Sequence, residues 1–130
     1  MTGSRFILDT NIVTAWLKGE PEIAGKIDKA KAIYLPITVI GELYYGAMFS
    51  TKIQKNISNI NKLTERYSVL LADEEVAVLY GRIKARLRKK GKPVPENDIW
   101  IAAIAARNDL ILITRDKHFR EIEEIRVRSW

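Results

Sequence analysis

Cysteine is absent from this sequence of 130 residues, and histidine occurs once, at position 118. The chain therefore has no disulfide framework and no cysteine nucleophile. A zinc site built from imidazole and thiolate ligands is nearly excluded for the same reason. We expect any bound metal ion to be held by oxygen ligands.

Long hydrophobic runs are also lacking. Near the N-terminus the apolar residues 6–8 run directly into Asp9, which argues against a signal peptide. The apolar stretch 102–106 belongs to a predicted helix that is too short to span a membrane. We therefore expect a cytoplasmic protein that does not associate with membranes.

The size and composition of the chain predict one domain that covers residues 1–130. This length is sufficient to enclose a single hydrophobic core. Hydrophobic residues make up 47% of the chain and charged residues 29%, which argues against extensive disorder. The formal charge of +6 favours a polyanionic partner, although a merely solvated basic surface explains it equally well.

Short apolar runs alternate with segments in which apolar residues recur at helical spacing. This alternation predicts right-handed βαβ crossovers and a three-layer α/β/α sandwich with a mostly parallel central sheet. Thr38, Asp73 and either Asn97 or Asp98 are the predicted first-turn or capping residues of three helices. The predicted strands cover residues 5–8, 33–35, 68–71, 110–113 and 125–127, and the predicted helices run through 12–17, 23–27, 38–47, 53–63, 74–87 and 98–107.

Four carboxylates stand at comparable places in this predicted topology. Asp9 follows the first strand and Asp116 follows the fourth, while Glu42 and Asp98 lie early in two helices. In an open α/β sheet, the loops beyond the carboxyl ends of the strands form the ligand crevice. We therefore expect the four acids to converge, although they are far apart in the sequence.

A cluster of acids is electrostatically costly, because like charges a few ångströms apart raise one another's pKa. A divalent cation would compensate for this cost. Mg²⁺ and Mn²⁺ prefer oxygen ligands, and Mg²⁺ keeps several waters, which suits a site with open positions for a substrate phosphate. Such a cation can activate water for attack on phosphorus, so the chemistry needs no His, Cys or Ser nucleophile.

Each acid also has a purely structural interpretation. Asp9 and Asp98 stand where either could simply cap a helix. Glu42 could be an ordinary solvated side chain, although its neighbours along the chain are mostly apolar. Asp116 could form an ion pair with Arg115 or Lys117. None of these interpretations explains why all four acids share one kind of position.

Four segments together resemble the motifs of PIN domains, and more narrowly those of VapC-type toxins of prokaryotic toxin–antitoxin pairs. Each motif is short and weakly specific, but the four occur in the same order and with similar spacing over essentially the whole chain. The segments are Phe6-Ile7-Leu8-Asp9-Thr10-Asn11, Ile40-Gly41-Glu42-Leu43-Tyr44-Tyr45-Gly46-Ala47, Asp98-Ile99-Trp100-Ile101-Ala102-Ala103 and Thr114-Arg115-Asp116-Lys117-His118-Phe119.

This resemblance implies a PIN-like nuclease domain of Rossmann-like topology and a Mg²⁺- or Mn²⁺-dependent endoribonuclease activity. Asp9 and Asp98 would be the leading metal ligands, and Asp116 and Glu42 would complete the site directly or through water. The polar residues Asn11 and Thr114 would support these ligands, although capping explains them equally well.

The resemblance also implies partners. The family's proteins are typically homodimers that cleave structured RNA and are inhibited by a VapB-type antitoxin, whose C-terminal segment lies across the active-site groove. The apolar faces of the predicted helices 38–47 and 53–63 would suit that segment.

A basic run extends from the end of the helix 74–87 into the loop before Asp98. We interpret it either as a solvated helix face or as a surface that holds RNA phosphates. His118 is expected to be a packing or capping residue, with contact to substrate as the alternative. The candidate RNA-binding residues are Arg86, Arg88, Lys89, Lys90 and Lys92, and Lys84 precedes them.

Two other functions remain open at this point. One is a PIN-like module that binds RNA or protein but has lost catalysis, which the four retained acids argue against. The other is a small phosphatase or a receiver domain. It would need a phosphate-cradling glycine-rich loop or a lysine facing an aspartate nucleophile, and neither is evident.

Overall fold

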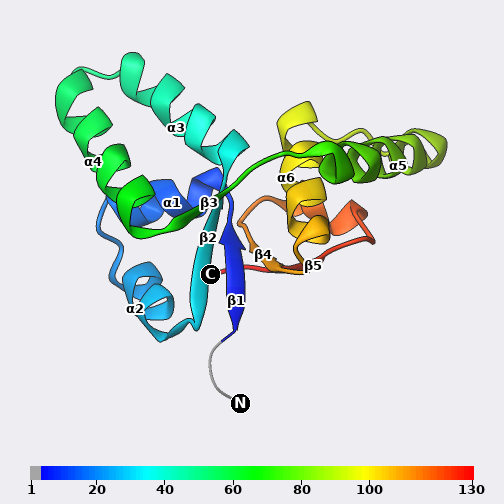
Figure 1. Cartoon of the computed structure of the whole chain (residues 1–130), viewed down its shortest axis with the longest axis horizontal. Coiled ribbons are helices and arrows are strands. Elements are labelled where there is room, and N and C mark those ends of the chain that lie inside the picture. The colour runs from blue at the N-terminus through cyan, green and yellow to red at the C-terminus, as the bar shows by residue number, and fades with distance from the viewer. Residues whose placement is uncertain (1–3) are drawn as a thin grey trace.

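Five parallel strands form the centre of the fold in the computed structural model, which describes residues 4–130 (Figure 1). Their order across the sheet is β3-β2-β1-β4-β5, and all four neighbouring pairs are parallel. The first strand is therefore in the middle, with β2 and β4 on either side. The strands are β1 Arg5–Leu8, β2 Ala32–Pro36, β3 Ser68–Leu70, β4 Ile111–Ile113 and β5 Arg126–Arg128.

The helices lie between successive strands, as the alternating pattern predicts. In Figure 1, α3 and α4 form the expected helical hairpin on one side of the molecule, while α5 extends outward on the other side. A short 3₁₀ helix, η1, follows β4. The helices are α1 Thr10–Leu17, α2 Pro21–Lys29, α3 Ile37–Met48, α4 Ile53–Arg66, α5 Glu74–Lys90, α6 Glu96–Arg107 and η1 Lys117–Glu121.

Two of the predicted helix starts are wrong. The residue that caps α3 is Pro36, so Thr38 is the second residue of the helix, and its hydroxyl has no hydrogen-bond partner among residues 4–130. Pro95 occupies the same position before α6, and Asp98 lies inside the first turn. Proline favours helix starts because its fixed φ suits entry into a helix. Its missing backbone N–H costs no hydrogen bond there, since the N–H groups at a helix start have no partner within the helix. Asp73 is the N-cap of α5, as predicted, and accepts a hydrogen bond from the backbone N–H of Val76 at 2.9 Å.

The hydrophobic core surrounds the central strands. β1 and β4 are almost entirely buried, and the middle of α6, from Ile101 to Ala105, has no exposed surface. Residues 102–105 of the apolar stretch are therefore core. No helix among residues 4–130 is both long and apolar enough to cross a membrane. In the described chain, the buried polar side chains are Asp9 and Thr114, which lie where β1 and β4 end.

Candidate active site

The carboxyl ends of β1 and β4 lie side by side because the two strands are paired in parallel register. Asp9 follows β1 directly, and its backbone N–H donates to the carbonyl of Ile113 at the end of β4 at 3.0 Å. Thr114 follows β4 directly. Residues more than 100 positions apart are thus brought to one edge of the sheet, where ligand crevices of α/β folds lie.

The Asp9 carboxylate is almost fully buried and is held by three donors. Its Oδ1 accepts from the backbone N–H of Thr10 at 2.8 Å, so Asp9 does cap α1. Its Oδ2 accepts from the hydroxyl of Thr114 at 2.6 Å and from the amide of Asn11 at 3.2 Å. Burial raises the pKa of Asp9 above its ordinary value, because these hydrogen bonds only partly offset the loss of solvation.

Asn11 and Thr114 connect the two loops that follow β1 and β4. The Asn11 amide also approaches the Thr114 hydroxyl, at 3.4 Å, and its carbonyl accepts from the backbone N–H of Arg115 at 3.2 Å. The Thr114 hydroxyl in turn accepts from the backbone N–H of Asp116 at 3.0 Å. The two residues predicted as polar supports therefore link Asp9 to the loop that carries Asp116.

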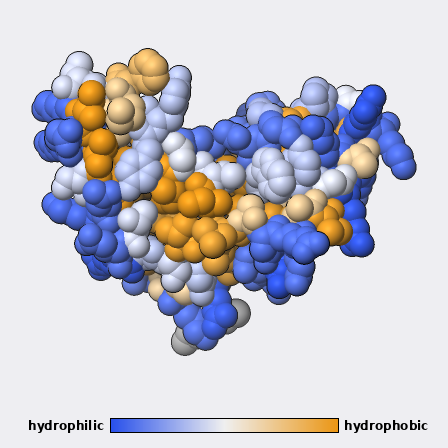
Figure 2. All heavy atoms as spheres, turned by 45° about the horizontal axis from the view of Figure 1, so that its top comes forward, coloured by the Kyte–Doolittle hydropathy of each residue, from blue (hydrophilic) through white to orange (hydrophobic). Residues whose placement is uncertain are grey.

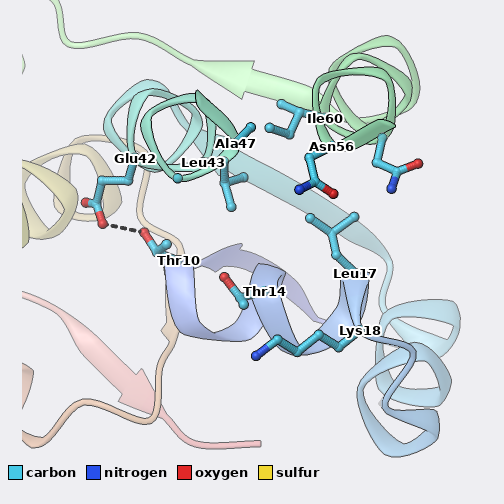
Figure 3. A pocket seen from close by; sticks show the side chains of 11 residues that line it. Thr10, Thr14, Leu17, Lys18, Glu42, Leu43, Ala47, Asn56 and Ile60 are labelled. Carbon is cyan, nitrogen blue, oxygen red and sulfur yellow. Dashed lines mark hydrogen bonds between the residues drawn. The ribbon is translucent and has the colours of Figure 1, made fainter. Parts of the chain in front are cut away.

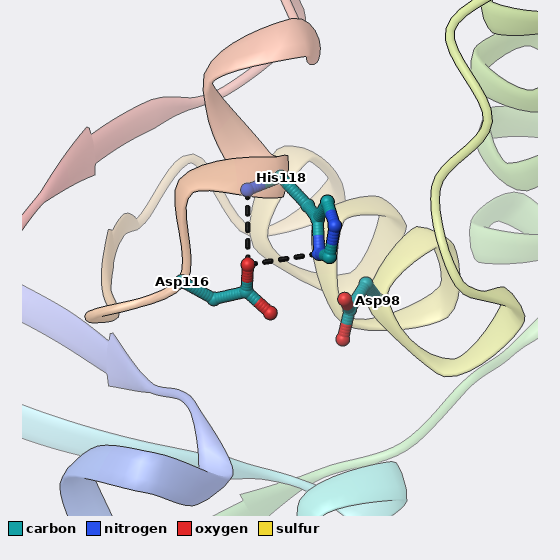
Figure 4. Close-up of side chains that lie close together, drawn as sticks. All are labelled: Asp98, Asp116 and His118. Carbon is teal, nitrogen blue, oxygen red and sulfur yellow. Dashed lines mark hydrogen bonds and ion pairs between the residues drawn. The ribbon is translucent and has the colours of Figure 1, made fainter.

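Asp98 and Asp116 converge with His118 into one compact group. One potential ligand atom from each of these three side chains lies within 4.8 Å of the other two. Figure 4 shows Asp98 reaching from α6 toward Asp116, with the His118 ring above both carboxylates. Among residues 4–130, Asp9 and Glu42 do not join this group at that distance.

Asp98 is the electrostatic centre of the site. Burial first, and then the charges of Asp9, Asp116 and Glu42, raise its pKa to about 7, while the nearby His118 acts in the opposite direction. The three other predicted acids are therefore all close enough to oppose ionisation of Asp98. The convergence expected from topology is present, although the four carboxylates are not equidistant.

Glu42 approaches from α3 on the side of α1. Its Oε2 accepts a hydrogen bond from the Thr10 hydroxyl at 2.8 Å, which fixes the carboxylate beside the start of α1 (Figure 3). Glu42 and Thr10 also line one end of a pocket of about 400 Å³ between α1, α3 and α4. The side chain of Glu42 is thus fixed by a hydrogen bond and lies between the acidic group and this pocket.

The suggested ion pair between Asp116 and its neighbours is wrong. Arg115 turns away from Asp116, binds both carboxylate oxygens of Glu20, at 2.9 and 3.3 Å, and donates to the carbonyl of Trp130. Asp116 instead caps η1 by accepting from the backbone N–H of His118 at 2.9 Å. Its second oxygen makes no hydrogen bond within residues 4–130 and remains available to a ligand.

The donor set of the acidic group fits a divalent cation. Two carboxylates and one imidazole lie within mutual reach, and the like charges around Asp98 make its ionised form unfavourable without a compensating positive charge. Carboxylate oxygens are the ligands that Mg²⁺ and Mn²⁺ favour.

Comparison with known proteins identifies the family. The PIN domain family matches residues 6–125, which is nearly the whole chain. The chain belongs to the PIN-domain family. This assignment and the five-stranded parallel sheet confirm both the resemblance noted in the sequence and the predicted α/β sandwich.

The similar proteins match along their full length. Ribonuclease VapC2 of Haemophilus influenzae is 36% identical over 129 residues, which cover 97% of this chain and 98% of the relative. The tRNA(fMet)-specific endonuclease VapC of Salmonella typhimurium is 32% identical over 130 residues, with the same coverage. A chain of VapBC-1 from nontypeable Haemophilus influenzae has a TM-score of 0.89 at 32% identity and covers 97% of this PIN domain and 98% of its own length.

His118 is the site residue of this PIN domain that sequence reasoning missed. Its ring is half-exposed and its Nδ1 lies 2.9 Å from Asp116 Oδ1, so it neither packs in the core nor caps a helix with its side chain. The expectation of oxygen ligands alone stays a prediction, but the imidazole is a third potential donor within reach of the two carboxylates. The usable signal was its position two residues after Asp116 in a short turn, where a side chain can return to the preceding carboxylate.

The basic run is divided into paired and free side chains. Arg86 binds Glu124 through two hydrogen bonds, at 2.6 and 2.9 Å, and Lys90 pairs with Glu123 at 2.7 Å. Lys84 pairs with Glu96 at 3.0 Å. Within this basic run, Arg88, Lys89 and Lys92 are exposed and form no ion pair with any of the residues that the structure describes.

Proposed function

We propose that this PIN domain, spanning residues 1–130, is a ribonuclease that hydrolyses internal phosphodiester bonds of RNA with Mg²⁺ or Mn²⁺. The single observation that carries the proposal is the convergence of Asp9, Glu42 and Asp116 on Asp98 at the carboxyl edge of the sheet, where burial first and then these three charges raise the pKa of Asp98 to about 7. The ribonuclease names of the relatives support RNA as the substrate class.

Asp98 and Asp116 would hold the cation directly, and Asp9 and Glu42 would complete the site directly or through water. A bound divalent cation supplies positive charge that activates a water molecule and neutralises the leaving oxygen. Asp9 is kept in place by Thr114 and Asn11, and Glu42 by Thr10, so these carboxylates are preorganised.

The groove between α1, α3 and α4 is the site that we propose for an antitoxin of the VapB type. Leu17, Leu43, Ala47 and Ile60 give it an apolar lining, and Glu42 at one end adjoins the acidic group (Figure 3). An amphipathic segment seated there would lie next to the catalytic carboxylates. The similar solved structure, VapBC-1 from nontypeable Haemophilus influenzae, supports a partner of this kind.

We also propose a cytoplasmic homodimer. Hydrophobic residues gather in the middle of the face shown in Figure 2, with hydrophilic residues on both sides. Exposed apolar side chains on or next to α3 include Tyr45, Met48 and Phe49, of which Phe49 is 78% exposed. Apolar surface of this kind is usually covered in an assembly. Light scattering of the purified protein tests the dimer.

RNA cleavage in defined metal conditions tests the catalytic proposal. Purified protein is incubated with total RNA and with single tRNAs, after chelation and after addition of Mg²⁺ or Mn²⁺. We expect internal cleavage that depends on the cation and is lost in Asp98→Asn and Asp9→Asn. Glu123→Gln, which alters a carboxylate outside the site, is the matched control.

Two outcomes would contradict this proposal. Cleavage that persists in both Asp variants would exclude the acidic group as the active site. Saturable Mn²⁺ and RNA binding without any cleavage would instead indicate the alternative function, a catalytically inactive module that binds RNA or protein.

A further inference from the structure

The side chain of His118 is directed at the acidic group, although more than half of its surface is exposed to solvent. Its Nδ1 lies 2.9 Å from Asp116 Oδ1, and its backbone N–H donates to the same oxygen at 2.9 Å. Asp116 is the N-cap of η1, so the first turn of this short helix fixes the carboxylate and the imidazole together. The position of the ring is thus determined by local structure as well as by charge.

The three side chains are spaced like ligands of one ion. Potential ligand atoms of Asp98, Asp116 and His118 lie within 4.8 Å of one another (Figure 4). Ligands at about 2.1 Å from a common octahedral ion are separated by about 3 Å when adjacent and about 4 Å when opposite. Small rotations of these side chains would therefore bring all three atoms onto one cation.

The nitrogen atom distinguishes between cations. Mg²⁺ is bound almost entirely by oxygen and releases its waters reluctantly. First-row transition ions accept imidazole, and their affinity for such sites rises from Mn²⁺ to Co²⁺. We propose that His118 is a nitrogen ligand of the catalytic cation and biases this site toward transition ions such as Mn²⁺ over Mg²⁺. This inference rests on the proposed metal site, but not on RNA as the substrate.

A purely supporting role of His118 makes a different prediction. A histidine that only donates a hydrogen bond to Asp116 would orient a carboxylate that any divalent cation uses. Its removal would then weaken the binding of Mg²⁺, Mn²⁺ and Co²⁺ by the same factor, because it would act only through the carboxylate that it orients. The relative losses of affinity for the three ions therefore show whether His118 binds the metal directly or only orients Asp116.

Calorimetric titration of the metal-free protein with Mg²⁺, Mn²⁺ and Co²⁺ tests the proposal without RNA. The variants are His118→Gln, which retains a hydrogen-bond donor, and His118→Ala. Lys117→Gln, at the neighbouring exposed position of η1, is the control. Pulsed electron paramagnetic resonance of bound Mn²⁺ provides a second readout, because a coordinated imidazole nitrogen couples to the electron spin.

We expect the dissociation constant of Mn²⁺ to rise on the order of tenfold in both His118 variants, with a larger rise for Co²⁺ and little change for Mg²⁺. The nitrogen coupling should vanish in both variants and persist in Lys117→Gln. Equal losses for all three ions, or no nitrogen coupling in the original protein, would overturn the proposal. If no cation binds the original protein, the proposed metal site itself fails, whereas loss of RNA cleavage alone leaves this inference intact.

Discussion

Two groups of carboxylates in this molecule have opposite electrostatic surroundings. At the edge of the sheet, Asp9 is buried and Asp98 is half-buried among other acids, and the pKa values of both are raised. On the outer side of α5, Glu123 and Glu124 face Lys90 and Arg86, and their pKa values are lowered. An ionised carboxylate therefore stabilises the fold beside α5 and destabilises it at the edge of the sheet.

This difference indicates which group is built for function. The charges around α5 neutralise one another within the chain, so this cluster needs nothing further to be stable. The acids at the sheet edge have no compensating cation among the residues that the structure describes other than the weakly positive influence of His118. A surplus of like charge is retained in a fold when a ligand of opposite charge uses it.

Substitution of one carboxylate in each group should give the sharpest contrast. Asp98→Asn is expected to reduce RNA cleavage about 10³-fold, because charge stabilisation by a metal contributes several kcal/mol and each 1.36 kcal/mol is tenfold in rate. Glu124→Gln should leave cleavage unchanged while lowering stability. Rates measured on one labelled RNA test this, and equal losses in the two variants would remove the distinction.

The free and paired cations of the basic run at the end of α5 and in the loop after it should differ in RNA binding. Replacing Arg88, Lys89 and Lys92 together by Gln is expected to weaken RNA binding about tenfold. The slope of log K against log salt concentration should become shallower by about two, because each phosphate contact to a single strand contributes about 0.7 to that slope. Lys90→Gln should have little effect, because this side chain is already paired with Glu123. Binding is measured across a salt series. An equal effect of Lys90→Gln would contradict the assignment.

Arg86 should matter for stability and not for catalysis. Arg86→Met removes two hydrogen bonds to Glu124 and one to the carbonyl of Glu121, at 3.2 Å. We expect the free energy of unfolding to fall by about 1–2 kcal/mol, the range for partly exposed charged hydrogen bonds. Denaturation with urea measures the loss, and Lys90→Met, an exposed pair, should cost less than about 1 kcal/mol.

The pH dependence of stability should also distinguish the two groups. Folded Asp98 keeps its proton up to about pH 7, whereas the unfolded chain releases it near the ordinary value of 3.8. Unfolding therefore releases a proton in this interval, and Asp98 lowers stability progressively as the pH rises from about 4 to about 7.

Melting temperatures in the presence of a chelator check this sign. The difference between Asp98→Asn and the original protein should grow from pH 5 to pH 7 and then level off. Glu124→Gln should show the reverse sense and at lower pH, because the lowered pKa of Glu124 gives stability that is fully present above its ordinary value of 4.5 and is lost as the pH falls below it. A constant difference for Asp98→Asn would show that its neighbours do not oppose its ionisation.

The sequence predicted most of the fold, because buried parallel strands and amphipathic helices leave different periodicities. Apart from the short 3₁₀ helix Lys117–Glu121, which was not predicted, the errors lie at element ends. The third strand ends at Leu70 and the fifth lies at Arg126–Arg128, one residue from the prediction, and prolines rather than Thr38 or Asp98 begin two helices. Such ends depend on a few hydrogen bonds, which periodicity does not record.

The convergence of the four acids was predicted from the sequence, but their arrangement was not. Asp9, Glu42, Asp98 and Asp116 were identified from their positions after strands or early in helices, and the structure places all of them around Asp98. That Asp116 rather than Asp9 shares the compact group with Asp98, and that His118 joins it, was not predicted. These are questions of side-chain direction, which spacing in the sequence does not define.

The sequence by itself determined the alternation of strands and helices, the four acids and the membership of the PIN-domain family. It did so because each of these is recorded in local pattern or in motif. Only the tertiary structure decided which charges face one another. Arg86 lies beside Glu124, and Asp98 lies beside Asp116, because segments that are distant in the sequence pack together. Coulomb interactions depend on distance in space, and a distance of a few ångströms between remote residues exists only once the chain has folded.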